Sequence, residues 1–297
     1  MIARAAARDG AIADATTILA LDRRGRPVCR NHPLLLQTIA ALLETHNATA
    51  INEILVHGFL RQSRERYEEH VAPQLEMVHG VEFEMGTAHS AARHFCGETP
   101  RHSVHLSPFL ISCYLVTNEL YALFDQSRLD FATRDRRRPV VGVTWIDASL
   151  FALWMGCRLP TEAEWEFACG LGSSSEWCCA AEEDLSKHAW FSENAGGTVQ
   201  WVGTREPNAL GLCDFHGNVW EWCADAYDAR YYARSPTRDP VNNDRGGDTH
   251  RVCRGGSVHA LAEMCRTRYR LHEPCHFWAG DLGFRLAADA ATAMGGE

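Results

Sequence analysis

Cysteine and histidine side chains gather near the carboxyl end of the chain, where they could ligate a metal. The candidates are Cys265 and Cys275 together with His259, His272 and His276. Thiolate sulfur and imidazole nitrogen are ligands that transition metals prefer. Cys275 and His276 are adjacent, which makes a shared tetrahedral site awkward. If several of these side chains converge in one pocket, the pattern predicts an oxidoreductase with a metal site around Cys265.

The same stretch, residues 258–281, also fits a binding surface. Large apolar and aromatic side chains accompany the histidines there, and the full candidate set is His259, Leu261, Tyr269, Leu271, His272, Cys275, His276, Phe277 and Trp278. Aromatic side chains dominate the energetics of protein interfaces, so this composition favours contact with a protein or a small ligand. In the alternative, Tyr269 or Trp278 packs beneath the loop as core. We expect Trp201 and the loop Tyr227–Tyr232 to flank the surface.

The overall composition limits the compartment and the partners. The chain has 297 residues and a net charge of −9, which argues against a nucleic-acid-binding surface. The one basic run, Arg134–Arg138, is interpreted as a solvated loop. Residues 1–20 show no clean apolar stretch typical of an export signal, and no window resembles a membrane span. We therefore expect a cytoplasmic chain without membrane contact.

The cysteines are predicted to be free thiols. Twelve are present, but no CxxC pair occurs, so a structural zinc site has poor support. In a reducing compartment buried thiols are more common than disulfides.

Two regions differ in texture. Residues 1–74 are predicted to form a helical extension, because apolar residues recur at helical spacing in 34–43 and again in 51–60. Such amphipathic helices must pack on something, either the main domain, another copy of the chain or a docked partner. Residues 75–290 instead show short apolar segments separated by Gly, Asn, Asp and Pro, which predicts one loop-rich α+β domain with short strands.

Two helices and two arginines should organise the larger domain. Thr161 and Glu164 have the spacing of a capping box, so a helix is predicted to begin there. A second helix is predicted over Trp145–Met155. Arg254 and Arg285 are expected to make bidentate contacts with buried carboxylates or carbonyls that pin the loops.

Motifs in a fixed order carry a resemblance to a known family. They are Pro139–Trp145, Gly156–Glu166, Pro207–Trp222, Arg251–Ser257 and Leu282–Leu286. In this order, from about Leu75 to Ala287, the chain resembles the formylglycine-generating (sulfatase-modifying factor) family. The resemblance implies that family's variant of the C-type lectin fold.

The resemblance also implies a calcium site in the loop before the Gly-Asn-x-Trp-Glu-Trp motif. Carried over position by position, its ligands are Asp214, the carbonyls of Gly217 and Val219, and Glu221. Oxygen donors of this kind suit calcium when water completes the coordination.

The same comparison bears on catalysis. The family's enzymes oxidise a substrate cysteine with molecular oxygen, using copper(I) held by two cysteines that follow the Gly-Gly-Ser motif. Here Cys265 occupies the second position, but Ala260 stands at the first. One thiolate cannot make a linear two-coordinate copper site, so formylglycine generation and copper binding are not expected. The iron-dependent sulfoxide synthases of this family need a His-x-x-x-His-x-Glu cluster, which the chain lacks.

A binding module is therefore the favoured interpretation, with the metal-dependent oxidoreductase as the alternative. Some relatives are targets of diversity-generating retroelements, which randomise Asn codons in the window that corresponds to 258–281. The His, Ala, Leu, Cys, Phe and Gly residues found there are compatible with such diversification.

Overall fold

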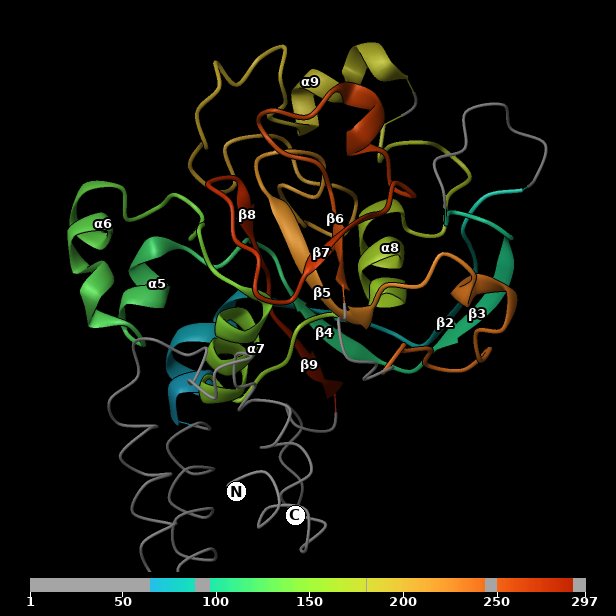
Figure 1. The fold of residues 1–297 in the computed structure, drawn as a ribbon, viewed down its shortest axis with the longest axis horizontal. Helices are drawn as coiled ribbons and strands as arrows, with labels where there is room; N and C mark the ends of the chain where they lie inside the picture. Colours follow the sequence, from blue (N-terminus) through green and yellow to red (C-terminus); the bar gives the residue numbers. More distant parts are fainter. Residues whose placement is uncertain (1–64, 89–96, 180, 244–249, 291–297) are drawn as a thin grey trace, which may run out of the picture.

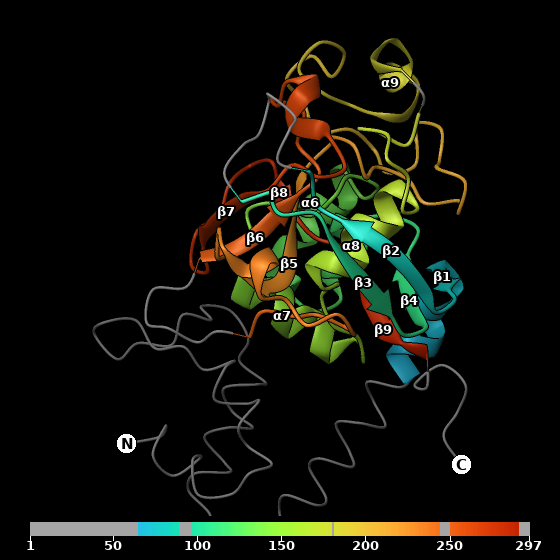
Figure 2. The ribbon, with the colours of Figure 1, turned by 90° about the vertical axis from the view of Figure 1, so that its right-hand side faces the viewer.

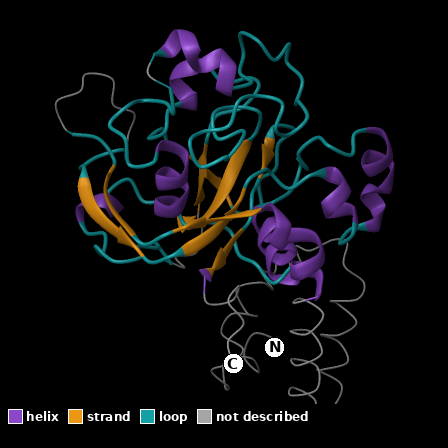
Figure 3. Cartoon of the chain, turned by 180° about the vertical axis from the view of Figure 1, so that it is seen from behind, coloured by secondary structure: helices purple, strands orange, loops and turns teal. Residues whose placement is uncertain are grey.

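The computed structural model describes residues 65–88, 97–179, 181–243 and 250–290. The two stretches of helical periodicity in 1–64 lie outside the described residues, so their role in oligomerisation or docking stays a prediction. Within the described residues short strands and helices alternate with long loops, as the sequence predicts for an α+β domain (Figure 3).

Nine short strands of the described residues form three sheets. One sheet has the order β1-β4-β9, a second pairs β2 with β3, and the third has the order β7-β6-β5-β8. Their bounds are β1 Leu75–Val78, β2 Val81–Met85, β3 His102–Leu106, β4 Phe109–Ser112, β5 Trp220–Ala226, β6 His250–Arg254, β7 Leu271–Pro274, β8 Leu282–Gly283 and β9 Ala287–Asp289. All pairs are antiparallel except β5 with β8.

Helices surround the sheets. They are α5 Asn118–Ala122, α6 Leu129–Arg134, α7 Trp145–Trp154, α8 Glu162–Gly170 and α9 Leu185–His188, with short turns η2 Tyr67–Val71, η3 Ala72–Gln74, η4 Gln126–Arg128, η5 Glu182–Asp184, η6 Tyr231–Ala233 and η7 Ala262–Cys265. Helix α8 lies between β5 and β6 of the four-stranded sheet on one side and the β2–β3 pair on the other (Figures 1 and 2). Loops form the end of the molecule that carries α9 and η7 (Figure 1).

The predicted capping box at the start of α8 is confirmed. The Glu164 amide donates to the Thr161 hydroxyl at 3.2 Å, and the Thr161 amide donates to the Glu164 carboxylate at 2.8 Å. The helix before it, α7, begins with an equivalent box of Thr144 and Asp147. Each box satisfies amides that the first helical turn leaves without intrahelical partners.

Two of the buried tryptophans donate from the indole to a backbone carbonyl. Trp145 Nε1 donates to Cys223 O at 2.8 Å, and Trp222 Nε1 donates to Val143 O at 3.1 Å. These two bonds join the start of α7 and the residues just before it to β5, which lies in the four-stranded sheet. A buried indole without a partner would be costly, so the bonds fix how the helix sits on the sheet.

The predicted pinning roles of Arg254 and Arg285 are also confirmed. Arg254, fully buried in β6, pairs with Glu162 at 2.9 Å and with Glu166 at 2.6 Å, both on α8. Arg285 forms two hydrogen bonds to Glu221 of β5, at 2.6 and 2.9 Å. Buried charges of this kind persist only when they are paired and hydrogen-bonded.

The first described residues pack on the main domain. Tyr67 and Val71 of η2 are buried in the same hydrophobic cluster as α7. Arg66 donates from Nε to Trp154 O at 2.9 Å, and its guanidinium lies 4.0 Å from the Trp154 ring centroid. The boundary predicted at 74/75 stays a prediction, but residues 65–74 share the core of the domain.

Candidate recognition surface

Two strands hold the ends of the 258–281 segment. It begins after β6 and Gly255–Gly256, passes through η7 and the edge strand β7, and ends at β8. The Ser257 hydroxyl donates to the Asp281 carboxylate at 2.6 Å, which closes the base of the segment. The segment is therefore a long excursion from a fixed frame, in which buried residues alternate with residues that face outward.

The structure brings part of the predicted set to the surface. Trp278, Leu261 and Phe277 are 65%, 58% and 38% exposed, and His259 and His276 are exposed beside them in the sequence. Large apolar side chains at such exposure favour a contact with another molecule over a role in the core. For Trp278 the alternative of packing beneath the loop is wrong.

Tyr269 belongs to the core instead. Its side chain is 8% exposed, and its ring centroid lies 5.8 Å from that of Trp220. Leu271, His272 and Cys275 are half-buried. Tyr269 can therefore support the surface from below but cannot contact a ligand directly in this arrangement.

The His272 ring is held between other rings. It stacks on Tyr227 with centroids 3.9 Å apart, and His250 meets it edge-on at 5.0 Å. Burial, with smaller contributions from His250 and Arg270, lowers the pKa of His272 below its usual value. His272 thus presents a neutral aromatic edge rather than a cation near pH 7.

Of the two segments predicted to flank the surface, one is exposed and the other ends in two buried tyrosines. Trp201 is 50% exposed, as expected for a flank. Tyr231 and Tyr232 are buried at 9% and 3%, so their assignment to the surface is wrong. The Tyr232 hydroxyl lies 3.1 Å from Arg254 Nη2, which makes it part of the buried charge network.

Cys265 does not stand ready as a metal ligand. Its side chain is fully buried, and burial raises the pKa of its thiol to about 12, whereas a metal requires the thiolate. The residue at the other family position, Ala260, has no donor. Among the residues that the structure describes, no group of three or more His, Cys, Asp or Glu side chains is placed to hold a metal ion. The residues at the two family positions, Ala260 and Cys265, therefore do not fit a two-thiolate copper site.

The predicted calcium loop is held by protein contacts. Asp214 accepts from Gly203 N at 2.8 Å and from Asn218 Nδ2 at 3.3 Å. Glu221 uses both carboxylate oxygens for Arg285. A calcium ion bound by Glu221 would have to displace the guanidinium, so the four predicted ligands do not form a free cage here. Calcium binding at Asp214, Gly217, Val219 and Glu221 stays a prediction.

His216 ties this loop to the recognition segment. Its Nδ1 lies 2.7 Å from Cys265 O, and Cys178 N donates to its Nε2 at 3.0 Å. This pattern fits a neutral ring with its proton on Nδ1. Burial lowers the pKa of His216 from 6.5 to about 4.

We expect His216 to make stability fall with acidification. Its pKa is lower in the folded state, so the unfolded state takes up the proton first as the pH drops from about 6.5 to 4. The expected loss is about 2 kcal/mol between pH 7.5 and pH 5. Asp225 acts in the opposite direction, since burial raises its pKa to about 7. Urea unfolding at both pH values should therefore compare the native chain with His216→Gln.

The variant should lack this part of the pH dependence, whereas His276→Gln, a change at an exposed histidine, should retain it. Equal pH dependence in the native chain and in His216→Gln would contradict the assignment.

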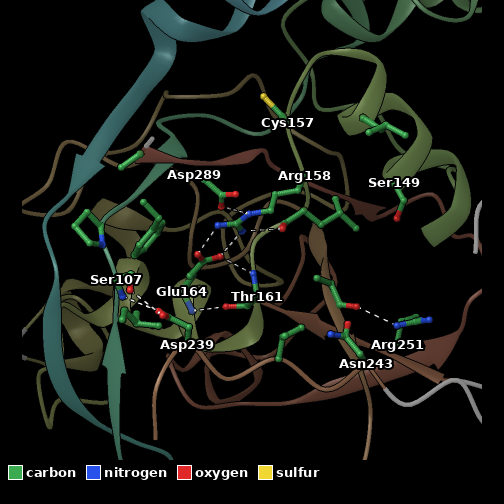
Figure 4. A pocket seen from close by; sticks show the side chains of 18 of the residues that line it. Ser107, Ser149, Cys157, Arg158, Thr161, Glu164, Asp239, Asn243, Arg251 and Asp289 are labelled. Atoms are coloured by element: carbon green, nitrogen blue, oxygen red, sulfur yellow. Dashed lines mark hydrogen bonds and ion pairs between the residues drawn. The ribbon is translucent and has the colours of Figure 1, made fainter. Parts of the chain in front are cut away.

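Sequence reasoning missed a pocket of about 740 Å³ that no residue of 258–281 lines. Its wall includes Trp145 and Leu153 of α7, and Arg158 crosses it between Glu164, at 2.6 Å, and Asp289, at 2.9 Å (Figure 4). No local signal marks it, because its lining comes from segments far apart in the sequence. Glu164 and Asp289 neutralise the Arg158 guanidinium, so Arg158 has no unpaired charge with which to bind an anionic ligand in this pocket.

The domain consists of short strands held by buried arginine–carboxylate pairs, and it displays the long 258–281 segment with its exposed aromatic side chains. This is the architecture of C-type-lectin-like proteins. The chain belongs to the sulfatase-modifying factor enzyme 1-like domain family, whose model matches residues 61–290. The resemblance read from the motifs is thereby confirmed, together with the fold that it implies.

Relatives include an enzyme and a variable protein. The chain is 32% identical to a formylglycine-generating enzyme of Streptomyces coelicolor, over 73% of this chain and 89% of the relative. Treponema denticola variable protein 1 has a similar structure, with a TM-score of 0.62 and 25% identity over 72% of this chain and 94% of the other. PvdO from Pseudomonas aeruginosa shares the fold at a TM-score of 0.62 and 24% identity, over 72% and 94% of the two chains.

None of the described helices combines the length and the apolar character that crossing a membrane requires.

Proposed function

We propose that this chain is a binding module that holds a protein or small ligand on the 258–281 surface. The observation that carries the proposal is the exposure of Trp278, Leu261 and Phe277 on a segment whose two ends are fixed by β6 and β8. Rigid aromatic groups lose little conformational entropy on binding, so such a surface can give both affinity and selectivity.

The similarity to a Treponema variable protein supports a finer proposal, in which the surface residues are diversified by a retroelement. Of the nine candidate positions, eight are exposed or half-buried, and only Tyr269 is buried. Changes at those eight positions would alter the ligand while leaving the buried arginine pairs intact. Repeated sequencing of the locus from one lineage should then show variation within 258–281 and none in β5 or β6.

The binding proposal is tested by comparing two variants of the full chain as affinity baits. The double variant Trp278→Ala/Leu261→Ala should retain about 10-fold less ligand than the native chain, or less still, because central aromatic and apolar contacts are lost. Leu153→Ala is the matched control, because Leu153 is 43% exposed and lines the pocket outside the surface. Equal retention by both variants would refute the proposal.

The enzymatic alternative draws its support from the formylglycine-generating relative. If the alternative holds, the chain supplemented with copper should oxidise a cysteine-containing peptide with molecular oxygen. The variant Cys265→Ala should lack this activity. The burial of Cys265 and the presence of Ala260 favour the binding module.

A further inference from the structure

A rigid turn beside the recognition surface carries a tryptophan–arginine stack at each end. At the first end, the Arg137 guanidinium lies 5.7 Å from the Trp201 ring centroid. At the other, the Arg205 guanidinium lies 3.6 Å from the Trp190 ring centroid. A guanidinium stacked on an aromatic face keeps its edge free, and that edge presents N–H donors in a fork that matches a carboxylate.

These two arginines differ from those that hold the fold together. Arg254, Arg266 and Arg285 each pair with a buried carboxylate. Among the described residues, neither Arg137 nor Arg205 has an ion pair, and Nε of Arg205 is buried without a hydrogen-bond partner. Burial lowers the pKa of Arg205, and because its Nε is buried, a ligand would have to meet its Nη atoms.

Protein contacts fix the turn between the two stacks. Val202 N donates to Arg137 O at 2.9 Å, and Gly203 N donates to the buried Asp214 carboxylate at 2.8 Å. At the far end Trp190 Nε1 donates to the Thr204 hydroxyl at 2.9 Å. Because the arginines are positioned before a ligand arrives, less conformational entropy is lost on binding.

Gly203 is required in this turn. It has a φ of +66°, and a Cβ there would lie 2.5 Å from the Tyr114 ring.

The loops that carry the two stacks contact the recognition segment. Ser192, two residues beyond Trp190, donates from its amide to Ala260 O at 3.0 Å. From Arg137 the chain runs to Gly142, whose amide donates to Ala279 O at 2.9 Å, next to Trp278. A Cβ on Gly142 would lie 3.9 Å from the Trp278 ring. The loops that carry the cationic donors thus contact the segment that carries the exposed apolar groups, and at protein interfaces apolar anchors are commonly bordered by polar groups.

We propose that the ligand of the recognition surface is a protein segment that carries Asp or Glu side chains, which Arg137 and Arg205 bind while Trp278 and its neighbours contact apolar residues. This inference rests on the proposed binding function and specifies its partner. The exposed Leu261 and Phe277 match apolar protein side chains better than a phosphate backbone.

A displayed library of random-sequence peptides is a suitable probe for the immobilised full chain. Selected peptides should be enriched in Asp and Glu next to aromatic or aliphatic residues. Arg137→Glu and Arg205→Glu should each lower the affinity of the selected peptides on the order of 10-fold. Added salt should lower their affinity for the native chain. Arg134→Glu makes the same charge change at an exposed position of α6 and should alter affinity less than about 3-fold.

The outcomes separate this inference from the proposed function. Peptides that lose affinity with Trp278→Ala but not with either arginine variant would overturn the acidic partner and leave the binding module standing. Selected peptides unaffected by Trp278→Ala would overturn both, as would a selection that enriches no peptide. Tighter binding of a labelled single-stranded DNA, weakened by the same arginine variants, would replace the acidic protein with a nucleic acid.

Discussion

Replacing Arg254 with methionine is expected to lower the free energy of unfolding by about 3–5 kcal/mol. The arginine is fully buried and pairs with Glu162 and Glu166 at 2.9 and 2.6 Å. It also donates to the carbonyls of Thr267 and Tyr269, which begin the return of the recognition segment toward β7. Methionine fills part of the volume, but it leaves carboxylates in the core that have lost a cation.

Urea-induced unfolding of the full chain measures this loss, with Arg136→Met as the control. Arg136 forms an ion pair with Glu119 at 2.8 Å, but both side chains are more than half exposed. Exposed pairs contribute little, so the control should change stability by less than about 1 kcal/mol. Should Arg254→Met not fold at all, Glu166→Gln removes one charge and leaves the other ion pair. A loss from Arg254→Met no larger than that of the control would show that the buried pairs do not hold the domain together.

Replacing Gly217 with alanine is expected to cost about 3 kcal/mol or more, or to prevent folding. A Cβ at this position would lie 2.1 Å from Trp190 O, and Gly217 has a φ of +83°. The obstacle is backbone, which cannot rotate away as a side chain could. The same carbonyl accepts the Asn218 amide at 2.7 Å, so moving it would break a further contact of the loop.

Gly211→Ala provides the matched control for the steric effect. Gly211 has a φ of +78°, but nothing lies within 4 Å of a Cβ built there. The control therefore carries the conformational penalty alone, about 1 kcal/mol. Thermal or urea unfolding gives the loss of stability in each variant, and the difference between the two losses is the cost of the clash with Trp190. Similar losses in both would mean that the loop can shift to accept a side chain.

The sequence was informative where chemistry is local or where two groups have few possible partners. The capping box of Thr161 and Glu164 depends on residues three apart, so spacing alone predicts it, and the structure has it. Arg254 and Arg285 sit among apolar residues, and a buried guanidinium needs carboxylates or carbonyls. Sequence could not name Glu162, Glu166 or Glu221 as the partners, because these lie 64 to 92 residues away along the chain.

Side-chain direction in the recognition segment was much less predictable. Tyr269 and Trp278 are both aromatic residues within one irregular stretch, yet one packs against Trp220 and the other is 65% exposed. A loop has no periodicity that would assign inward and outward positions. The Arg134–Arg138 run was correctly interpreted as solvated, but nothing in its sequence indicates that Arg137 stacks on Trp201.

By itself the sequence determined the family, the α+β class, the anchors of 258–281 and the absence of a second copper-ligating cysteine, since each follows from residue identity at a matched position. Only the tertiary structure decided which side chains face outward, that Glu221 is occupied by Arg285 and that Arg137 and Arg205 lie over tryptophan rings. The physical reason is that exposure and pairing depend on segments distant in the chain, and packing alone brings those segments together.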